Sequence, residues 1–108
     1  MEVEIKKSTR KGKKLVAIFY ENGKKVKTTH FGSLPNKDYT IYNKIDGKKI
    51  ADEKKKLYLA RHNPKVTKER WDLPQTSGAL SRWILWNKRN LNDSIKDYVK
   101  RFKLKLKK

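Results

Sequence analysis

The chain has 108 residues, 30 of them Lys or Arg and 11 Asp or Glu, so its formal net charge is +19. It contains no cysteine, which excludes disulfides, thiolate catalysis and cysteine-ligated zinc. Only 35% of the residues are hydrophobic, which predicts one small domain with a thin core and a solvated basic surface. The longest apolar runs, at 15–20 and 83–86, are far too short to cross a bilayer, and residues 1–4 lack the apolar core of a signal peptide.

The first third of the chain has the pattern of a three-stranded antiparallel meander. Val3 and Ile5 alternate with charged residues, as in an edge strand. In the next strand, at 13–20, residues 15–20 are apolar on both faces, as in a central strand covered on both sides. Asn22-Gly23 predicts a type I′ hairpin turn. In the returning strand at 25–31, alternation predicts two faces, one with Val26, Thr28 and His30 and the other with Lys25, Lys27 and Thr29.

Helices are predicted after a connector at residues 32–47. The first spans 48–61, with Ile50, Leu57 and Tyr58 on one apolar face, and Asn63-Pro64 ends it. Thr76 or Ser77 is expected to cap a largely buried helix that runs through Leu80 to Trp86. Asn90 is expected to cap the last helix, whose apolar stripe is formed by Ile95, Tyr98, Val99 and Phe102.

Residues 103–108 alternate Leu with Lys and predict either a flexible lysine-rich tail or a short added strand. Taken together, the elements predict a single α+β domain over residues 1–108. Its three-stranded antiparallel meander packs against two to three C-terminal helices.

The second half of the chain carries a distinctive run, Thr-Ser-Gly-Ala-Leu-Ser-Arg-Trp-Ile-Leu-Trp-Asn-Lys at 76–88. With Ser-Ile-Lys-Asp-Tyr at 94–98 and Lys-Arg-Phe at 100–102, it resembles a family of short lysine-rich uncharacterised proteins of large nucleocytoplasmic DNA viruses of algae and amoebae. The resemblance covers roughly residues 14–103 and extends upstream to His30-Phe31-Gly32, Asp38-Tyr39-Thr40, Arg61-His62 and Trp71. Arg89-Asn90 stands where relatives tend to have Pro-Thr. The resemblance implies a viral setting and supplies no mechanism.

Residues suited to catalysis are few. His30 and His62 are the only histidines, and neither lies in a metal-binding spacing or beside an evident catalytic partner. Asp46, Asp52 and Glu53 are surrounded by lysines, and local ion pairing explains them as well as a metal site does. No phosphate-binding glycine loop is present. We therefore predict no enzymatic activity, no metal and no cofactor.

The aromatic residues have two interpretations, as core or as platforms for nucleic-acid bases. Trp83 and Trp86 lie three apart on a strongly apolar helix, which favours the core. Trp71 is in a loop and its role stays open. Tyr39 and Tyr42 lie in a polar connector and are the better candidates for exposed aromatic contacts.

Basic residues give the strongest functional signal. Lys far outnumbers Arg, which favours contacts with phosphates over the reading of bases. The candidate nucleic-acid-binding residues flank the first turn, follow the hairpin and end the chain: Lys6, Lys7, Arg10, Lys11, Lys13, Lys14, Lys24, Lys25, Lys27, Lys100, Arg101, Lys103, Lys105, Lys107 and Lys108.

Three functions fit these patterns to different degrees. The favoured one is a non-enzymatic viral protein that binds DNA, with double-stranded DNA preferred, or another polyanion through phosphates, largely without sequence specificity, and is packaged in the virion. The alternative is a minor capsid or other structural virion protein whose basic surface contacts capsid, membrane or genome. A small nuclease would need the carboxylates Asp46, Asp52 and Glu53 to hold magnesium, and this is disfavoured.

Overall fold

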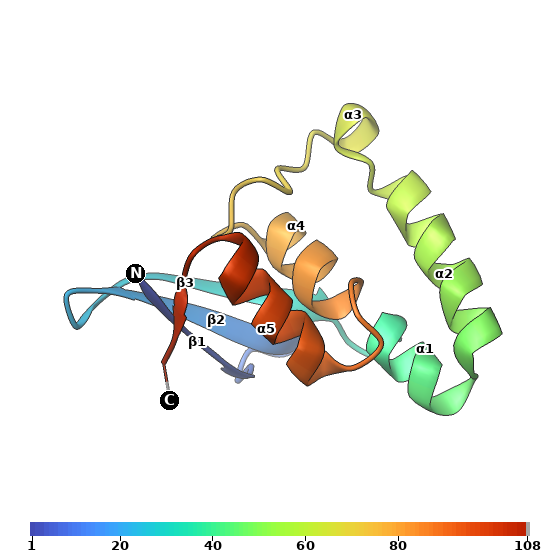
Figure 1. Cartoon of the computed structure of the whole chain (residues 1–108), viewed down its shortest axis with the longest axis horizontal. Helices are drawn as coiled ribbons and strands as arrows, with labels where there is room; N and C mark the ends of the chain where they lie inside the picture. Colours follow the sequence, from blue (N-terminus) through green and yellow to red (C-terminus); the bar gives the residue numbers. More distant parts are fainter. Residues whose placement is uncertain (108) are drawn as a thin grey trace.

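A computed structural model describes residues 1–107 and has a four-stranded mixed sheet with helices on one side (Figure 1). The strands are β1 (Glu2–Lys7), β2 (Lys13–Glu21), β3 (Lys24–Ser33) and β4 (Lys105–Leu106), in the spatial order β3-β2-β1-β4. β2 pairs antiparallel with both β1 and β3, so the first three strands form a meander. This confirms the predicted α+β class with an N-terminal meander.

The β2–β3 hairpin forms at the predicted turn. Asn22 and Gly23 both have positive φ, at 51° and 79°, as a type I′ turn requires. A bulge follows, because Phe19 lies opposite Lys27 whereas Tyr20 lies opposite Lys25. Lys25 and Lys27 therefore lie on opposite faces of the sheet, and the prediction that they share a face is wrong.

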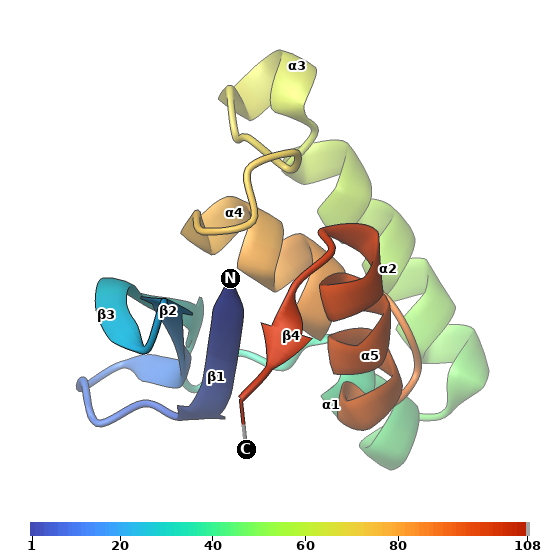
Figure 2. The same cartoon turned by 60° about the vertical axis from the view of Figure 1, so that its left-hand side comes forward.

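The C-terminal segment adds the fourth strand. β4 runs parallel to the start of β1, with the Lys105 N–H donating to the Met1 carbonyl at 3.0 Å and the Lys107 N–H to the Val3 carbonyl at 2.8 Å (Figure 2). Of the two predictions for residues 103–108, a short strand therefore forms at Lys105–Leu106. Lys108 lies outside the described residues.

Within residues 1–107, six helical segments follow the meander, and most are preceded by a residue whose side chain caps them. They are α1 (Tyr39–Ile45), α2 (Lys48–Arg61), α3 (Pro64–Thr67), α4 (Ser77–Leu80), the π-helical turn η1 (Ser81–Leu85) and α5 (Leu91–Arg101). Thr76 caps α4 by accepting from the Ala79 N–H, and Asn90 caps α5 by accepting from the Asp93 N–H, as predicted.

Helix α1 was not predicted, because its seven residues lie in the polar segment expected to be a connector. The Asp38 carboxylate begins it by accepting from the N–H groups of Thr40 and Ile41. Only Tyr39 is buried within it, so no apolar period marks this helix in the sequence.

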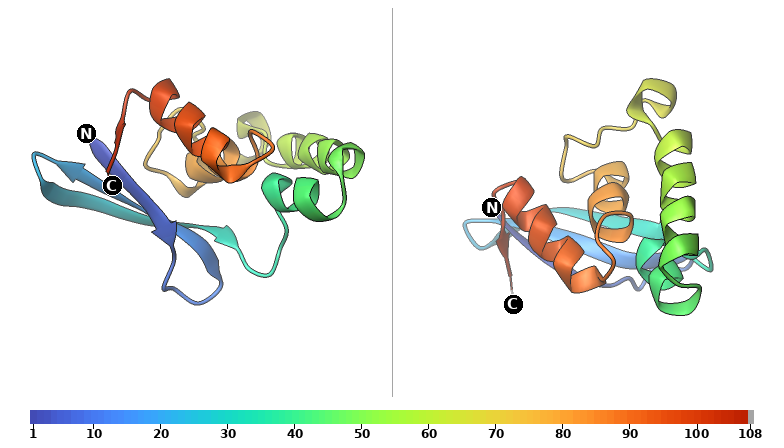
Figure 3. Two further views of the ribbon diagram at one scale, coloured as in Figure 1. Left: turned by 60° about the horizontal axis from the view of Figure 1, so that its bottom comes forward. Right: turned by 45° about the vertical axis from the view of Figure 1, so that its right-hand side comes forward.

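The core lies between the sheet and the helices of its covered face. α4, η1 and α5 pack over one face, as Figure 3 shows. The sheet and the helices contribute comparable numbers of side chains to it: Val3, Ala17, Phe19, Phe31, Leu80, Ile84, Leu85 and Tyr98.

No helix among residues 1–107 lies on the opposite face of the sheet (Figure 3), yet Val16 and Ile18 of β2 are buried there. The Ser8 hydroxyl bonds the His30 Nδ1 at 2.7 Å, and the Tyr20 hydroxyl donates to Glu4 at 3.2 Å. The first contact joins the turn after β1 to β3, and the second joins β2 to β1. Both faces of β2 are therefore buried, as predicted. Side chains cover the second face, where a second layer of helices would otherwise be needed.

Helices α1, α2 and α3 form an arm that extends away from the sheet beyond the end of β3 (Figure 1). α2 has the predicted bounds, but its predicted apolar face is wrong, because Ile50 and Leu57 are exposed and Ala51 is the buried residue. Within residues 1–107, every helix is too short or too polar to span a bilayer.

Candidate nucleic-acid interface

Most of the acidic residues are already engaged with basic ones. Seven ion pairs form among residues 1–107 and involve seven of the 11 carboxylates but only six of the 30 lysines and arginines. The other lysines and arginines of the described chain have no carboxylate oxygen within 4.0 Å. The excess positive charge is therefore left at the surface, available to an anionic partner.

Three of the predicted phosphate-binding residues, Lys6, Lys14 and Arg101, form ion pairs, and of these only the Lys14 pair is buried. The Lys14 Nζ lies 2.7 Å from Asp38 Oδ2, and the two side chains are only 11% and 3% exposed. Because the other oxygen of Asp38 caps α1, this pair ties β2 to the arm. Lys14 therefore has a structural role and is not available to phosphates.

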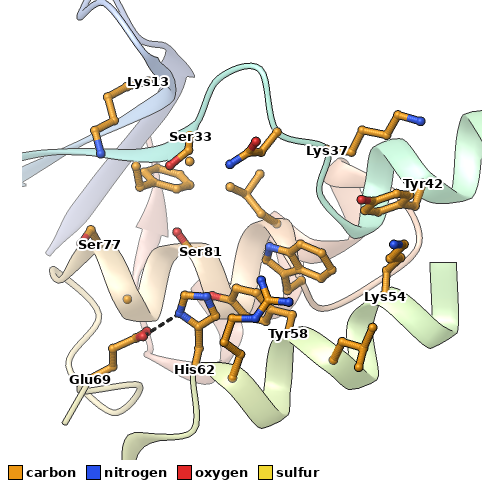
Figure 4. Close-up of a pocket in the computed structure, with 18 residues that line it drawn as sticks. Lys13, Ser33, Lys37, Tyr42, Lys54, Tyr58, His62, Glu69, Ser77 and Ser81 are labelled. Carbon is orange, nitrogen blue, oxygen red and sulfur yellow. Dashed lines mark hydrogen bonds and ion pairs between the residues drawn. The ribbon is translucent and has the colours of Figure 1, made fainter. Parts of the chain in front are cut away.

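A groove of about 720 Å³ lies between the end of the meander and the arm (Figure 4). Lys13, Ser33 and Lys37 lie along one wall, and Lys54 and Arg61 of α2 lie along the other. The side chains of Phe31, Leu85 and Trp86 also line it, together with Ser77 and Ser81 of the α4–η1 helix. We call this site the groove.

Stacked aromatic rings run along the α2 side of the groove. The Tyr58 ring stacks against His62 at 4.3 Å and 23° and against Trp86 at 4.4 Å and 3°, measured between ring centroids and planes. We call these three rings the aromatic ladder. Tyr42 stands beside it, with its centroid 6.2 Å from that of Trp86.

The ladder carries little negative charge. Burial raises the pKa of the Tyr58 hydroxyl, and the nearby Glu69 carboxylate raises it further, so Tyr58 stays neutral at physiological pH. Glu69 Oε2 lies 2.8 Å from the Nδ1 of His62, and Glu69 is the only carboxylate that lines the groove within the described residues. Four basic side chains line the same groove, so its net charge is positive.

A second hollow, of about 380 Å³, lies at the outer edge of β3, and we call it the β3-edge hollow. Arg10 of the first turn lines it with Lys27 and His30 of β3, because the Ser8–His30 bond draws that turn against the strand. Ser77 lines both hollows, so they adjoin. Together they carry six lysines and arginines (Lys13, Lys37, Lys54, Arg61, Arg10 and Lys27) against one carboxylate among the residues the structure describes.

Some of the predicted basic residues lie at the two edges of the sheet. Arg10, Lys13 and Lys27 line the hollows, and Lys24 and Lys25 continue along β3, which has a strand on one side only. At the opposite edge, Lys103, Lys105 and Lys107 lie on or next to β4, with the Lys107 Nζ 4.8 Å from the Tyr20 ring centroid. The remaining predicted residues lie at the end of β1, in the first turn and at the end of α5: Lys6, Lys7, Lys11, Lys100 and Arg101.

The two tyrosines of the predicted connector have different environments. Tyr39 is 4% exposed and its hydroxyl donates to Asp52 at 2.7 Å, so it is not the exposed aromatic that the sequence suggested. Tyr42 lines the groove, with the Lys37 and Lys54 ammonium groups 5.5 and 5.7 Å from its ring centroid. Only Tyr42 is therefore placed to contact a ligand.

The tryptophans also differ from one another. Trp83 packs against the core, its Nε1–H donates to the Trp71 carbonyl at 2.8 Å, and the guanidinium carbons of Arg82 and Arg101 lie 4.1 and 3.7 Å from its ring centroid. Trp83 is thus a core residue, the interpretation that the sequence favours over a platform for bases. Trp86 packs against the core as well, but it also lines the groove. The sequence pattern does not distinguish Trp86 from Trp83 in this respect.

The carboxylates considered for a metal are dispersed. Asp46 pairs with Lys37 at 2.9 Å and Asp52 with Arg89 at 3.0 Å. Hydrogen bonds from Arg89 and Tyr39 lower the pKa of Asp52. Across residues 1–107, no group of three or more potential ligands is arranged to hold a metal ion.

Sequence reasoning missed the α2 side of the interface. Lys54 and Arg61 were absent from the predicted set, as were Lys37 and the two ladder residues Tyr58 and His62. Tyr58 and His62 are four apart and share a helix face, which was a usable signal, but nothing local indicates that Trp86 joins them.

Comparison of the chain with protein-family models, with curated proteins and with solved structures finds no match. The resemblance to viral proteins stays a prediction from the motifs, and a role for the two hollows rests on their geometry and charge.

Proposed function

We propose that this protein is a non-enzymatic nucleic-acid-binding protein that contacts the phosphate backbone of double-stranded DNA largely without sequence specificity. The observation that supports it best is the pair of adjoining hollows. Among the described residues, six basic side chains and only one carboxylate line them. Lysine and arginine neutralise phosphates and release condensed counterions, which supplies most of the free energy of non-specific binding.

The outer edge of β3 gives this surface its length. Basic side chains follow one another from Lys24 and Lys25 at the hairpin, through Lys27 and Arg10, to Lys13 opposite Ser33. Ten extended residues span roughly 30 Å, which matches about nine base pairs of duplex at ~3.4 Å each. Thr28 and Ser77 line the same hollow, and hydroxyls of this kind are neutral donors that commonly fix a backbone in position.

Four of the six basic residues in the hollows are lysines, which act as point charges and do not read base edges in bidentate pairs. The proposal is therefore one of backbone binding. In the viral setting that the sequence motifs suggest, the ligand is the packaged genome and the protein is a virion component.

The test is a salt titration of the full chain against a fluorescent 20-base-pair duplex. If the five basic side chains along the outer edge of β3 (Lys24, Lys25, Lys27, Arg10 and Lys13) each contact a phosphate of the duplex, log Kd plotted against log salt has a slope of about 4.5 in magnitude. Affinity then falls about 500-fold between 50 and 200 mM KCl. Absence of binding at 50 mM KCl overturns the proposal and leaves the minor capsid role as the better interpretation.

Two double variants locate the contacts while removing the same charge. Arg10→Gln with Lys27→Gln alters the β3-edge hollow, whereas Lys103→Gln with Lys105→Gln alters exposed residues at the opposite edge of the sheet. We expect the first pair to reduce the slope by about 2, at ~0.9 per phosphate lost, and the second to reduce it less. Equal reductions would show that net charge alone drives binding.

A further inference from the structure

We propose that the groove is a binding site for one unpaired nucleotide of a nucleic-acid strand, with its base against the aromatic ladder and its phosphate between the basic walls. This assignment rests on the proposed function, because it gives the groove a ligand of the same class. It adds a preference for single-stranded segments that the β3-edge hollow does not provide.

The dimensions of the groove suit a ligand of that size. Sites for small molecules and cofactors commonly enclose roughly 300–1,000 Å³, and the groove encloses about 720 Å³. In a duplex each base is stacked between its neighbours, so its faces are hidden. Only an unpaired base can leave the stack and offer a face to a protein ring.

The ring set is the second observation. Tyr42, Tyr58, His62 and Trp86 all line the groove, and Tyr58 and Trp86 are within 3° of parallel. Aromatic side chains bind bases of any sequence, because every base has a π face. The stacking of Tyr58 on Trp86 also holds α2 to the body, so these rings have a structural role beside the one proposed here.

Charge completes the site. Lys54 on α2 lies across the groove from Lys13 and Lys37 (Figure 4), and Arg61 of the same helix also lines it, so an entering phosphate meets cations on both sides. Of these four, only Lys37 forms an ion pair within the described chain, with Asp46.

Glu69 is the one groove residue whose charge opposes a phosphate. The ring nitrogen of His62 lies 2.8 Å from its carboxylate, and the Trp71 indole donates to it at 3.4 Å. These two contacts hold the carboxylate against the protein and reduce its repulsion of the ligand.

The connection at Ser77 explains how a strand reaches the groove. Ser77 lines the groove and the β3-edge hollow, so a backbone held by Arg10 and Lys27 can continue past Ser77. The nucleotide that leaves the backbone path at this point is the one that enters the groove. DNA ends, bulges and single-stranded segments have such nucleotides, and intact duplex does not.

The experiment compares the octanucleotide (dT)8 with the 20-base-pair duplex in binding to full-length protein. Lys54→Gln with Arg61→Gln removes two charges from the groove. Lys49→Gln with Lys56→Gln removes two charges from exposed positions of the same helix that do not line the groove. We expect the groove pair to weaken (dT)8 binding about tenfold more than the control pair does, and both pairs to weaken duplex binding equally.

An NMR measurement on the unaltered protein gives an independent readout. The indole N–H signal of Trp86 should shift on addition of (dT)8 and not on addition of duplex, because only a stacked base alters the ring current there. Trp83, whose indole N–H is bonded to the Trp71 carbonyl and which does not line the groove, is the internal control. This readout does not depend on whether a variant folds.

The possible results separate the two proposals. If neither (dT)8 nor duplex binds, the proposed function itself is overturned. If both bind but the groove and control pairs lose affinity equally, or duplex shifts Trp86 as (dT)8 does, only the groove assignment is overturned. An octaglutamate peptide that displaces (dT)8 at equal charge concentration would likewise overturn it, since the groove would then be an unselective anion site.

Discussion

Gly32 is the residue on which the geometry of the groove depends most closely. It lies at the end of β3 with φ of +81° and lines the groove next to Leu85. A Cβ at this position would lie 2.8 Å from Leu85 Cδ1 and 3.1 Å from Lys14 Cβ. The absence of a side chain therefore allows β2, β3 and η1 to approach one another.

Replacing Gly32 with alanine should destabilise the protein by about 2–5 kcal/mol, from left-handed backbone strain of ~1–2 and overpacking of ~1–3 kcal/mol. Gly12→Ala is the matched control, because Gly12 has the same φ of +81° and an added Cβ would meet no atom within 4 Å. Urea unfolding of the two variants measures the difference. Equal losses of stability in the two variants would show that Leu85 moves aside for the added Cβ at no cost in free energy.

At the scale of elements, the arm is held to the body by a few polar and aromatic contacts. Asp52 of α2 accepts from the Tyr39 hydroxyl of α1 and pairs with Arg89 in the loop before α5. The Lys55 Nζ donates to the Asn87 carbonyl at 2.7 Å, and the ladder stacks α2 on Trp86. The α2 wall of the groove is thus positioned by contacts with two segments, helix α1 and residues 86–89.

Asp52 makes part of this attachment dependent on pH. Its pKa is lowered below its ordinary 3.8 by hydrogen bonds from Arg89 and Tyr39, so its contribution is present above pH 4 and is lost as the pH falls through the folded pKa. We expect the stability difference between the unaltered protein and Asp52→Asn to shrink between pH 5 and pH 3 in urea unfolding. Glu53→Gln, one residue away and in no ion pair among residues 1–107, is the control and should show a smaller change. A difference that is constant with pH would contradict this role of Asp52.

At the scale of the whole molecule, the charge of +19 is distributed over a body with principal extents of 42 × 29 × 28 Å. Most basic groups have no acidic partner in the described chain, so repulsion among them opposes the folded state. Screening acts over about 30 Å at 0.01 M salt and about 10 Å at 0.1 M, which covers the spacing of these charges.

We therefore expect Tm to rise as NaCl increases from 10 to 200 mM, most steeply below ~0.1 M. Thermal unfolding followed by circular dichroism measures it. KCl should give the same rise, because screening does not depend on the identity of the cation. A fall in Tm with salt would mean that the seven ion pairs outweigh the repulsion.

Local signals were enough to predict much of the fold. Asn22-Gly23, the caps at Thr76 and Asn90 and the Pro64 that follows α2 act within a few residues of the chain, so they can be read directly. The short helix α1 and the bulge between β2 and β3 escaped prediction, because a single capping carboxylate and one extra residue leave no periodic pattern.

The basic character of the protein follows from the sequence alone, because charge is a sum over residues. Which charges meet is decided by the tertiary structure: Lys14 is buried against Asp38, Arg10 is drawn to β3, and the tail lies at the far edge of the sheet. The groove exists only because α2 folds back and stacks Tyr58 on Trp86, which lies far along the chain. Contacts between segments so far apart depend on the packing of the whole chain, which no local pattern encodes.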